Sequence, residues 1–449
     1  MPLRITPSKG ALTAIRRLEA NGFEAYAVGG CVRDSLLGRL PNDWDLTTNA
    51  LPEETAACFS DLRVIETGIK HGTVTVLIEG EPIEITTYRL DGEYADNRHP
   101  IKVTFSKNIE DDLSRRDFTV NAMAYHPERG LIDPFGGQED LSHALIRCVG
   151  SPKKRFEEDG LRILRAVRFA SVLGFELEGK TARQVVACRQ LLDNIACERI
   201  REEFQKLICG KAAVGILRDY VAVILQFLPE LAPCVGFPQN SRYHCYDVWE
   251  HTLHALAVTR STDSTVRLAI LLHDVGKPHC YTEDAQGGHF QGHAEHSVRL
   301  AEDILCRLRY DNATRELLLK LIRYHDLPLS AEPKHVKRAL LRYGEYGLAA
   351  LLELQRCDRL AHAPQYATPS PALDEIPLVV ERIKAENACL SLRSLALKGD
   401  DLLTLGYKPG PTVGATLQTL LDLVIDGELP NEKDALLAYL AKKSNVRSE

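Results

Sequence analysis

The chain has 449 residues, of which 45% are hydrophobic, and a formal net charge of −7. This length exceeds what one hydrophobic core supports, so roughly two to four domains are expected, and no apolar run reaches the ~18 residues of a membrane-spanning helix. The acidic balance excludes a uniformly basic coat for nucleic acid but leaves room for a local basic surface.

The N-terminal residues 1–22 have the pattern of an amphipathic helix and lack the apolar segment of a signal peptide. The twelve cysteines are scattered singly, without a Cys-x-x-Cys pair. Such spacing in a long chain favours a reducing compartment over a disulfide scaffold. We therefore expect a cytoplasmic protein with no membrane partner.

The segment GGCVRDSLLGRLPNDWDL begins with Gly29 and Gly30, continues with Arg33, and ends on two aspartates, Asp43 and Asp45. In an extended strand residues i and i+2 point to one side, so the two carboxylates would repel each other unless a divalent cation lay between them. The glycines would let backbone N–H groups approach a triphosphate, and Arg33 could pair with its oxygens. The alternative is an Asp-rich turn with solvated side chains.

Residues 73–90, TVTVLIEGEPIEITTYRL, alternate in polarity on both sides of Glu79-Gly80, which predicts a β-hairpin. Ile83 and Ile85 would face the core, so Glu84 would face the other side of the sheet. A third carboxylate beside the two aspartates would complete an oxygen site for two Mg²⁺ ions, which lie ~3.5–4 Å apart in enzymes of phosphoryl transfer. An exposed strand glutamate without a ligand is the alternative.

From about residue 151 the hydrophobic periodicity becomes helical. We expect Asp159 and Arg162 at i and i+3 of one helix, where both can face one ligand. A carboxylate acceptor beside a guanidinium donor matches the pairing edges of cytosine and adenine and refuses uracil and guanine, which present the reverse order. An ordinary salt bridge between the two residues is the alternative.

Arg165 and Arg168 continue this face in steps of three. They could meet phosphates of a nucleotide or an RNA end. They could equally form ion pairs with Glu157 and Glu158, and the sequence leaves both interpretations open.

In the helical body, imidazole and carboxylate side chains recur at His251, His273, Asp274, His293, His325 and Asp358. A His-Asp pair at the end of an apolar helix is costly to bury unless both side chains bind something, and this donor set suits a transition metal better than Mg²⁺. Lys277 is well placed to meet a phosphate. His289 and His296 lie near His293 in the sequence, and the choice of His293 among the three follows from the family resemblance given below.

Five ordered stretches of the first ~210 residues resemble the motifs of class II tRNA nucleotidyltransferases, the family of CCA-adding enzymes and bacterial poly(A) polymerases. These stretches are residues 28–48, 115–125, 133–137, 157–170 and 198–208. The resemblance implies Mg²⁺ on Asp43, Asp45 and Glu84, CTP and ATP as substrates, and tRNA as the partner. It implies nucleotide binding by Gly29, Gly30, Arg33, Arg98, Arg116, Asp117, Asn121, Asp159, Arg162, Arg165 and Arg168.

Arg98 comes from residues 91–100, which resemble the flexible loop that helps this family to switch from C to A addition. A mobile surface loop without such a role is the alternative.

The histidine and aspartate positions of the body resemble the HD superfamily of metal-dependent phosphohydrolases, which implies Ni, Co, Mn or Fe at that site. A degenerate HD fold kept as scaffold is the alternative. Two other functions stay open for the whole chain. One is a poly(A) polymerase that shares the head motifs, and the other is a nucleotide phosphohydrolase that uses the HD site beside a vestigial head.

The expected fold class is an α/β nucleotidyltransferase head, with an antiparallel or mixed sheet, followed by a mostly all-α remainder. The expected domains are a head at 1–150, a base- and RNA-binding neck at 151–212, a helical body with the HD domain at 213–365, and a tail at 366–449. The tail resembles the region that holds the outer part of tRNA. The sequence does not predict an oligomeric state.

Overall fold

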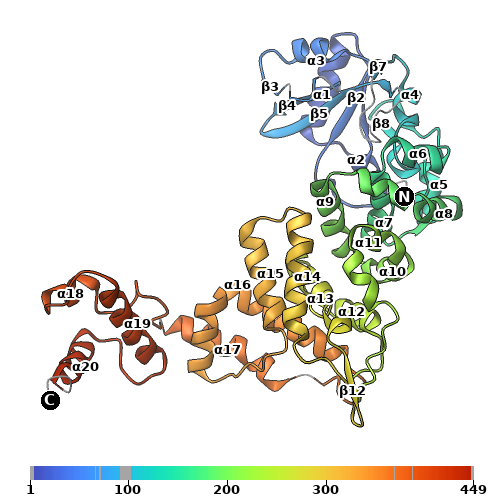
Figure 1. Ribbon diagram of the computed structural model, residues 1–449. Helices are drawn as coiled ribbons and strands as arrows, with labels where there is room; N and C mark the ends of the chain where they lie inside the picture. Colours follow the sequence, from blue (N-terminus) through green and yellow to red (C-terminus); the bar gives the residue numbers. More distant parts are fainter. Residues whose placement is uncertain are drawn as a thin grey trace. The chain divides into compact units, whose positions relative to one another are not determined.

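The computed structural model describes residues 5–65, 67–69, 72–91, 103–368, 370–386 and 388–445. The chain divides into two compact units (Figure 1). The first unit comprises residues 1–229 and 307–309, and the second comprises residues 230–306 and 310–449. The finer division into head, neck, body and tail stays a prediction.

The first unit contains a seven-stranded mixed sheet. Its strands, in spatial order, are β3 (Arg63–Ile65), β4 (Thr73–Ile78), β5 (Glu81–Thr87), β2 (Asp45–Thr48), β1 (Ala25–Val28), β8 (Ala124–His126) and β9 (Gly130–Ile132). The β2–β5 pair is parallel, and the other neighbouring pairs are antiparallel. The predicted α/β head with a mixed sheet is confirmed.

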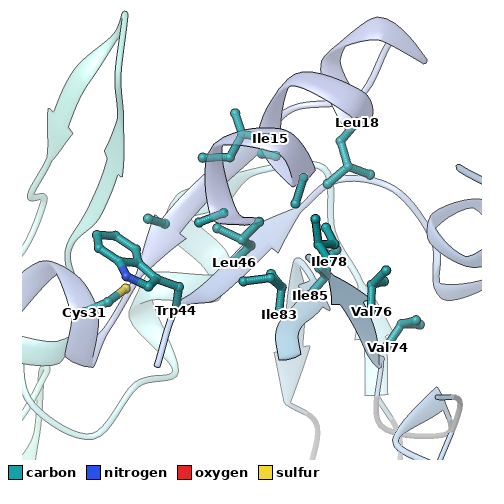
Figure 2. Packing of buried hydrophobic residues seen from close by; sticks show 14 of the residues in the cluster. Ile15, Leu18, Cys31, Trp44, Leu46, Val74, Val76, Ile78, Ile83 and Ile85 are labelled. Carbon is teal, nitrogen blue, oxygen red and sulfur yellow. The ribbon is translucent and has the colours of Figure 1, made fainter. Parts of the chain in front are cut away.

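One face of this sheet carries the main hydrophobic core of the unit. Ile15 and Leu18 of helix α1 (Lys9–Ala20) lie over Leu46 of β2 and Ile83 of β5 (Figure 2). The predicted hairpin is confirmed as β4 and β5, and both residues of its turn have a positive φ, 51° at Glu79 and 85° at Gly80. Because the side chains of a strand alternate between its two faces, the buried isoleucines of β5 direct Glu84 away from this core.

The opposite face of the sheet has a smaller core, formed around Tyr26, Val28, Tyr88, Leu113 and Ala124. Other elements of this part of the chain are α2 (Gly30–Leu36), α3 (Pro52–Cys58), β6 (Arg89–Asp91), β7 (Val103–Phe105), α4 (Ile109–Ser114), the 3₁₀ helix η2 (Thr119–Asn121) and α5 (Gly137–Ser142).

The rest of the first unit is mainly helical, as the periodicity predicts. Its elements are β10 (Leu145–Ile146), α6 (Pro152–Glu158), α7 (Leu161–Leu173), β11 (Glu176–Leu177), α8 (Gly179–Ala187), η3 (Arg189–Asn194), α9 (Cys197–Ile208), α10 (Ala213–Asp219) and α11 (Val221–Phe227).

The prediction that Asp159 and Arg162 share one helix is wrong. Helix α6 ends at Glu158, Asp159 is extended with φ −141° and ψ 107°, and α7 begins at Leu161. The Asp159 carboxylate accepts a hydrogen bond from the Leu161 N–H at 3.0 Å, which satisfies a donor at the start of the new helix. Gly160 follows at a point where a Cβ atom would lie 2.8 Å from the carbonyl oxygen of Leu191.

The second unit is also mainly helical. Its elements are η4 (Pro229–Cys234), α12 (Val248–Ala257), α13 (Ser264–Leu272), η5 (Lys277–His279), the hairpin β12 (Thr282–Asp284) and β13 (Gly287–His289), α14 (His293–Arg307), α15 (Asn312–Arg323), α16 (Pro333–Leu360), α17 (Pro371–Ala385), α18 (Gly399–Thr404), α19 (Pro411–Ile425) and α20 (Lys433–Asn445). None of the described helices is both long enough and apolar enough to cross a bilayer.

In the last part of the second unit, helix α17 begins at Pro371. Residues 397–414 are rich in glycine and proline but include the short helix α18, whose first turn is stabilised by a hydrogen bond from the Lys398 N–H to the Asp401 carboxylate.

The contact at Gly160 gives a stability prediction. We expect Gly160→Ala to destabilise the first unit by about 1–3 kcal/mol, because the added Cβ meets backbone rather than a movable side chain. The matched control is Gly215→Ala in α10, where no heavy atom lies within 4 Å of the added Cβ. This control should stabilise the unit slightly. Thermal unfolding of both variants tests the prediction, and an unchanged midpoint for Gly160→Ala would contradict it.

Candidate functional site

The carboxylates predicted to bind a cation lie at the edge of the parallel strand pair. Asp45 is the first residue of β2, and its register partner in β5 is Glu84. Asp43 precedes the strand, so the expectation of two aspartates within one strand holds only for Asp45. Burial, followed by the negative charges of Asp43 and Glu84, raises the pKa of Asp45 to about 6, whereas Arg116 opposes this rise.

The side-chain oxygens of Asp43, Asp45 and Glu84 do not form a close cluster. Among the described residues they do not form a group whose ligand oxygens all lie within 4.8 Å of one another. Carboxylates that repel one another attract a divalent cation placed between them. The donor set consists of hard oxygens and therefore fits Mg²⁺.

The glycine segment lies beside these carboxylates. Gly29 has a φ of 80° and precedes α2, and a Cβ atom there would lie 2.9 Å from Nη1 of Arg116. Arg116 also acts electrostatically on Asp45, and its Nη2 donates to Asp112 at 3.2 Å. Its buried Nε has no hydrogen-bond partner among the described residues. The arrangement thus brings a glycine turn, a carboxylate pair and an unsatisfied cationic donor to one place.

A continuous chain of hydrogen bonds connects this segment to α7. Arg33 donates from Nε and Nη2 to Asp34, each at 2.9 Å, and from Nη1 to Oδ1 of Asn121 at 2.6 Å. Asn121 donates to Oδ1 of Asp117 at 3.1 Å, and Asp117 accepts from Nε and Nη2 of Arg165 at 2.8 and 2.6 Å. We call the set Arg33, Asn121, Asp117 and Arg165 the polar relay.

The polar relay extends to α9 through Glu203. This carboxylate lies 3.7 Å from Nη1 of Arg165 and accepts from Nε of Arg168 at 2.7 Å. Burial opposes ionisation of Asp117, but Arg165 and the hydrogen bond from Asn121 hold its pKa well below the usual range. Arg165 and Arg168 therefore pair with Asp117 and Glu203.

The two residues expected to read the base each have their own partner. Asp159 accepts from Nη2 of Arg199 at 3.1 Å. Arg162 donates from Nη1 to Glu158 at 2.6 Å and from Nη2 to the carbonyl oxygen of Arg115 at 2.8 Å. Both side chains are held in place before any base arrives. The other expected nucleotide-binding residue, Arg98, lies outside the described residues.

In the second unit, the side chains predicted to bind a transition metal converge from separate helices. They form two groups whose ligand atoms lie within 4.8 Å of one another, and the groups share Asp274. The first group is His251, His273, Asp274 and Asp358, and the second is Asp274, His293 and His325. His289 instead pairs with Asp284 at 2.9 Å, and neither it nor His296 belongs to either group.

Three of the histidines direct Nε2 toward Asp274. In His273, His293 and His325, Nδ1 lies 2.7–2.9 Å from the carbonyl oxygen three residues earlier. A carbonyl only accepts, so Nδ1 carries the hydrogen, and Nε2 is the atom left to bind a metal once it is unprotonated. In His273, burial is outweighed by the carboxylates of Asp274 and Asp358, which raise the pKa of the imidazole to about 10, so a metal at its Nε2 would displace a proton. The Nε2 atoms of His293 and His325 are 3.1 Å apart, and two lone pairs at that distance repel unless a proton or a metal cation lies between them.

Buried charge at Asp274 supports the same interpretation. Its Oδ1 has no hydrogen-bond partner among the described residues, and Oδ2 lies 2.6 Å from Nζ of Lys277. Burial opposes ionisation, yet His273 and Lys277 hold the pKa of Asp274 well below its usual range. Burial and the nearby His273 lower the pKa of His325 to about 4, which favours the neutral form that binds metals.

A cavity of about 440 Å³ opens onto this cluster. Sequence reasoning missed two of its lining residues, His244 and His362, whose ring centroids are 4.9 Å apart. His362 follows the ligand Asp358 by four residues in the chain, a spacing that could have revealed it. His244 has no such signal, because it lies in an irregular segment before α12, so no helical spacing relates it to His251.

Three family profiles match the chain. A profile described as "Poly A polymerase head domain" matches residues 25–147, "Probable RNA and SrmB- binding site of polymerase A" matches residues 174–234, and "tRNA nucleotidyltransferase domain 2 putative" matches residues 293–440.

Similar proteins cover the chain almost completely. A CCA-adding enzyme of Lactobacillus helveticus is 35% identical over 96% of both chains, and one of Geobacillus thermodenitrificans is 33% identical over 99% of both. The crystal structure of the Bacillus stearothermophilus CCA-adding enzyme in complex with CTP is 31% identical, with a TM-score of 0.74 over 98% of each chain. The Thermotoga maritima CCA-adding enzyme complexed with tRNA shares the fold at 21% identity, with a TM-score of 0.54 over 96% of this chain and 94% of its own.

The raised pKa of Asp45 gives a pH-dependent prediction. A carboxyl whose folded-state pKa is above its unfolded value favours the folded state below about pH 4 and destabilises it as the pH rises through about 6. In EDTA at pH 8, Asp45→Asn should therefore raise the thermal midpoint, by an amount corresponding to on the order of 1–3 kcal/mol. The gain should vanish near pH 4.

The control for this experiment is Glu128→Gln, an exposed position between β8 and β9 of the same unit. It should leave the midpoint unchanged at both pH values. An equal gain for Asp45→Asn at pH 4 and pH 8 would contradict electrostatic repulsion as the cause.

Proposed function

The chain belongs to the family of CCA-adding enzymes and is a tRNA nucleotidyltransferase. We propose that it adds and repairs the 3′-terminal CCA of tRNA with CTP and ATP. The observation that carries the proposal is the register pairing of Asp45 with Glu84 beside Gly29 and Arg116. Two carboxylates on adjacent strands, with a glycine turn and a cationic donor next to them, supply the parts that nucleotidyl transfer needs.

We assign Mg²⁺ binding to Asp43, Asp45 and Glu84, whose repulsion a cation would relieve. When bound, Mg²⁺ would stabilise charge on the reacting phosphate oxygens. The N–H groups around Gly29 and the unsatisfied Nε of Arg116 are suited to holding the triphosphate. Arg33 is already bonded to Asp34 and Asn121, so we assign it chiefly to fixing the glycine segment.

We assign base selection to Asp159 and Arg162. Cytosine and adenine both offer an amino group to a carboxylate and a ring acceptor to a guanidinium, whereas uracil and guanine present a carbonyl where the carboxylate lies. Asp159 is fixed by its bonds to the Leu161 N–H and to Arg199, and Arg162 by Glu158. Fixed groups discriminate better than mobile ones, because a wrong base cannot reorient them.

We propose tRNA as the acceptor substrate and the cytoplasm as the location. The names of the relatives support tRNA, and so does the RNA-binding profile over residues 174–234. The α18–α20 region, with its own small core around Leu395, Leu402 and Leu420, is the proposed contact for the outer part of tRNA. A poly(A) polymerase, which shares the head profile, is the alternative that the products of the reaction would distinguish.

A second, metal-dependent phosphohydrolase activity is proposed for the cluster around Asp274. Its donor set fits Ni, Co, Mn or Fe, and the facing Nε2 atoms of His293 and His325 favour metal binding over a scaffold role. When bound, the metal would activate a water for attack on phosphorus. Lys277 lines the adjoining cavity and, together with the ion pair that it makes with Asp274, is suited to binding a phosphate oxygen.

The first test uses purified protein, trimmed tRNA and each of the four NTPs. Wild type should add two C residues and then one A. Asp45→Ala and Glu84→Ala should each lose at least about a hundredfold in rate, since each removes a proposed Mg²⁺ ligand. Glu79→Gln, in the exposed β4–β5 turn, is the control and should keep full activity.

The products of this test separate the alternatives. Addition of long runs of A alone would favour the poly(A) polymerase. More than a few per cent of residual activity in Asp45→Ala or Glu84→Ala would contradict the proposed Mg²⁺ site.

The second test concerns the cluster around Asp274. Wild type should retain a transition metal through purification in elemental analysis, and should hydrolyse a phosphomonoester or a 2′,3′-cyclic nucleotide. His273→Ala and His293→Ala should lose both properties and keep CCA addition, while His289→Ala, outside both ligand groups, should keep all three. A wild-type protein with neither bound metal nor hydrolysis would identify the cluster as scaffold.

A further inference from the structure

The carboxylate of Asp159 has both of its oxygens engaged. Oδ1 accepts from the Leu161 N–H at 3.0 Å, within the break between α6 and α7. Oδ2 accepts from Nη2 of Arg199 at 3.1 Å, and the two side chains are 18% and 28% exposed. A partly buried charged hydrogen bond of this kind fixes the direction of the carboxylate more firmly than a solvated one.

Arg199 has hydrogen-bonding capacity left over. It lies in the first turn of α9, and its Nη1 is buried without a hydrogen-bond partner among the described residues. Leaving a buried guanidinium N–H unpaired is unfavourable. Next to a carboxylate proposed to contact a base, such a donor is expected to find its acceptor on the bound nucleotide once binding opens the site around it.

Arg162, the neighbouring arginine, is arranged differently. Its Nη1 is bonded to Glu158 and to the carbonyl oxygen of Arg155, and its Nη2 is bonded to the carbonyl oxygen of Arg115. Each of its terminal nitrogens therefore already has an acceptor within the protein. The unsatisfied donor beside Asp159 belongs to Arg199.

We propose that Arg199 is a specificity-determining residue of nucleotidyl transfer. Its Nη2 holds the Asp159 carboxylate in the orientation that accepts the amino group of cytosine or adenine, and its Nη1 donates to an acceptor of the same bound nucleotide. This inference rests on the proposed role of Asp159 in base selection. It adds a residue from α9 that acts on the base partly through Asp159 and partly by direct contact.

The Arg199 side chain would have two effects, one on the orientation of Asp159 and one on the affinity for the nucleotide. Arg199→Ala frees Oδ2 of Asp159, so the carboxylate can turn away from the carbonyl of a wrong base and the repulsion weakens. Loss of one charged hydrogen bond should lower the ratio of kcat/KM for CTP over UTP roughly tenfold. Arg199→Lys retains a cation beside Asp159 but has no planar fork. It should restore most of this ratio and leave KM raised for CTP and ATP alike.

The experiment measures single-nucleotide addition of CTP, UTP, ATP and GTP to trimmed tRNA by full-length variants. Arg201→Ala is the matched control, because this arginine lies on the same helix and bonds to the carbonyl oxygen of Arg309 instead. It should leave the CTP-to-UTP ratio unchanged. Thermal unfolding of each variant identifies a loss of fold, which would lower all four rates together and leave their ratios unaltered.

Asp159→Ala and the double variant Asp159→Ala/Arg199→Ala complete the design. If Asp159→Ala keeps wild-type selectivity, the proposed base selection itself fails. If Asp159→Ala loses selectivity but Arg199→Ala keeps it, base selection stands and only the role of Arg199 is overturned. Loss of selectivity in both single variants, with no further loss in the double variant, supports the proposal.

Discussion

The ion pair between Asp117 and Arg165 is the interaction on which the arrangement of the first unit most depends. A buried charge is tolerated only when it is paired and hydrogen-bonded. Here Asp117 also accepts a hydrogen bond from Asn121, and Arg165 also forms an ion pair with Glu203. Through Asn121 the pair reaches Arg33 and the glycine segment, and through Glu203 it reaches Arg168 and α9. The loop proposed to hold a triphosphate and the helices proposed to hold a base are thereby tied into one network.

This network changes how the arginines of the unit are understood. In the sequence, Arg33, Arg165 and Arg168 are candidates for phosphate binding, and for Arg165 and Arg168 the local alternative is an ion pair with Glu157 or Glu158. In the structure their partners are Asp34, Asn121, Asp117 and Glu203. All but Asp34 lie more than 30 residues away in the chain. Such pairings depend on tertiary structure, which hydrophobic periodicity does not report. Arg116 differs from these three, since its Nε is buried without a partner among the described residues.

Strands and helices that follow a regular hydrophobic pattern were predicted well from the sequence. Breaks within such a pattern were predicted poorly. Alternation of polarity located the β4–β5 hairpin and the side of the sheet that Glu84 faces, because strand geometry fixes which side chains share a face. The helical period runs through Asp159-Gly160 without a visible change, so the break there was missed. A local signal did exist, since Asp followed by Gly is common where one helix ends and another begins. The histidine cluster was located by motif resemblance, whereas His244 and His362 became visible only as lining of the cavity.

The sharing of Asp274 by two ligand groups has a consequence for the order in which cations bind. The group with Asp358 supplies two carboxylates, and the group with His293 and His325 supplies one. A first divalent cation therefore gains more attraction in the group that contains Asp358. Once it is bound, it offsets the negative charge of the common carboxylate and weakens the field that a second cation meets. Occupancy by two ions would thus be anticooperative: loading would proceed in two steps of unequal affinity, and the second ion would exchange with solvent more readily than the first.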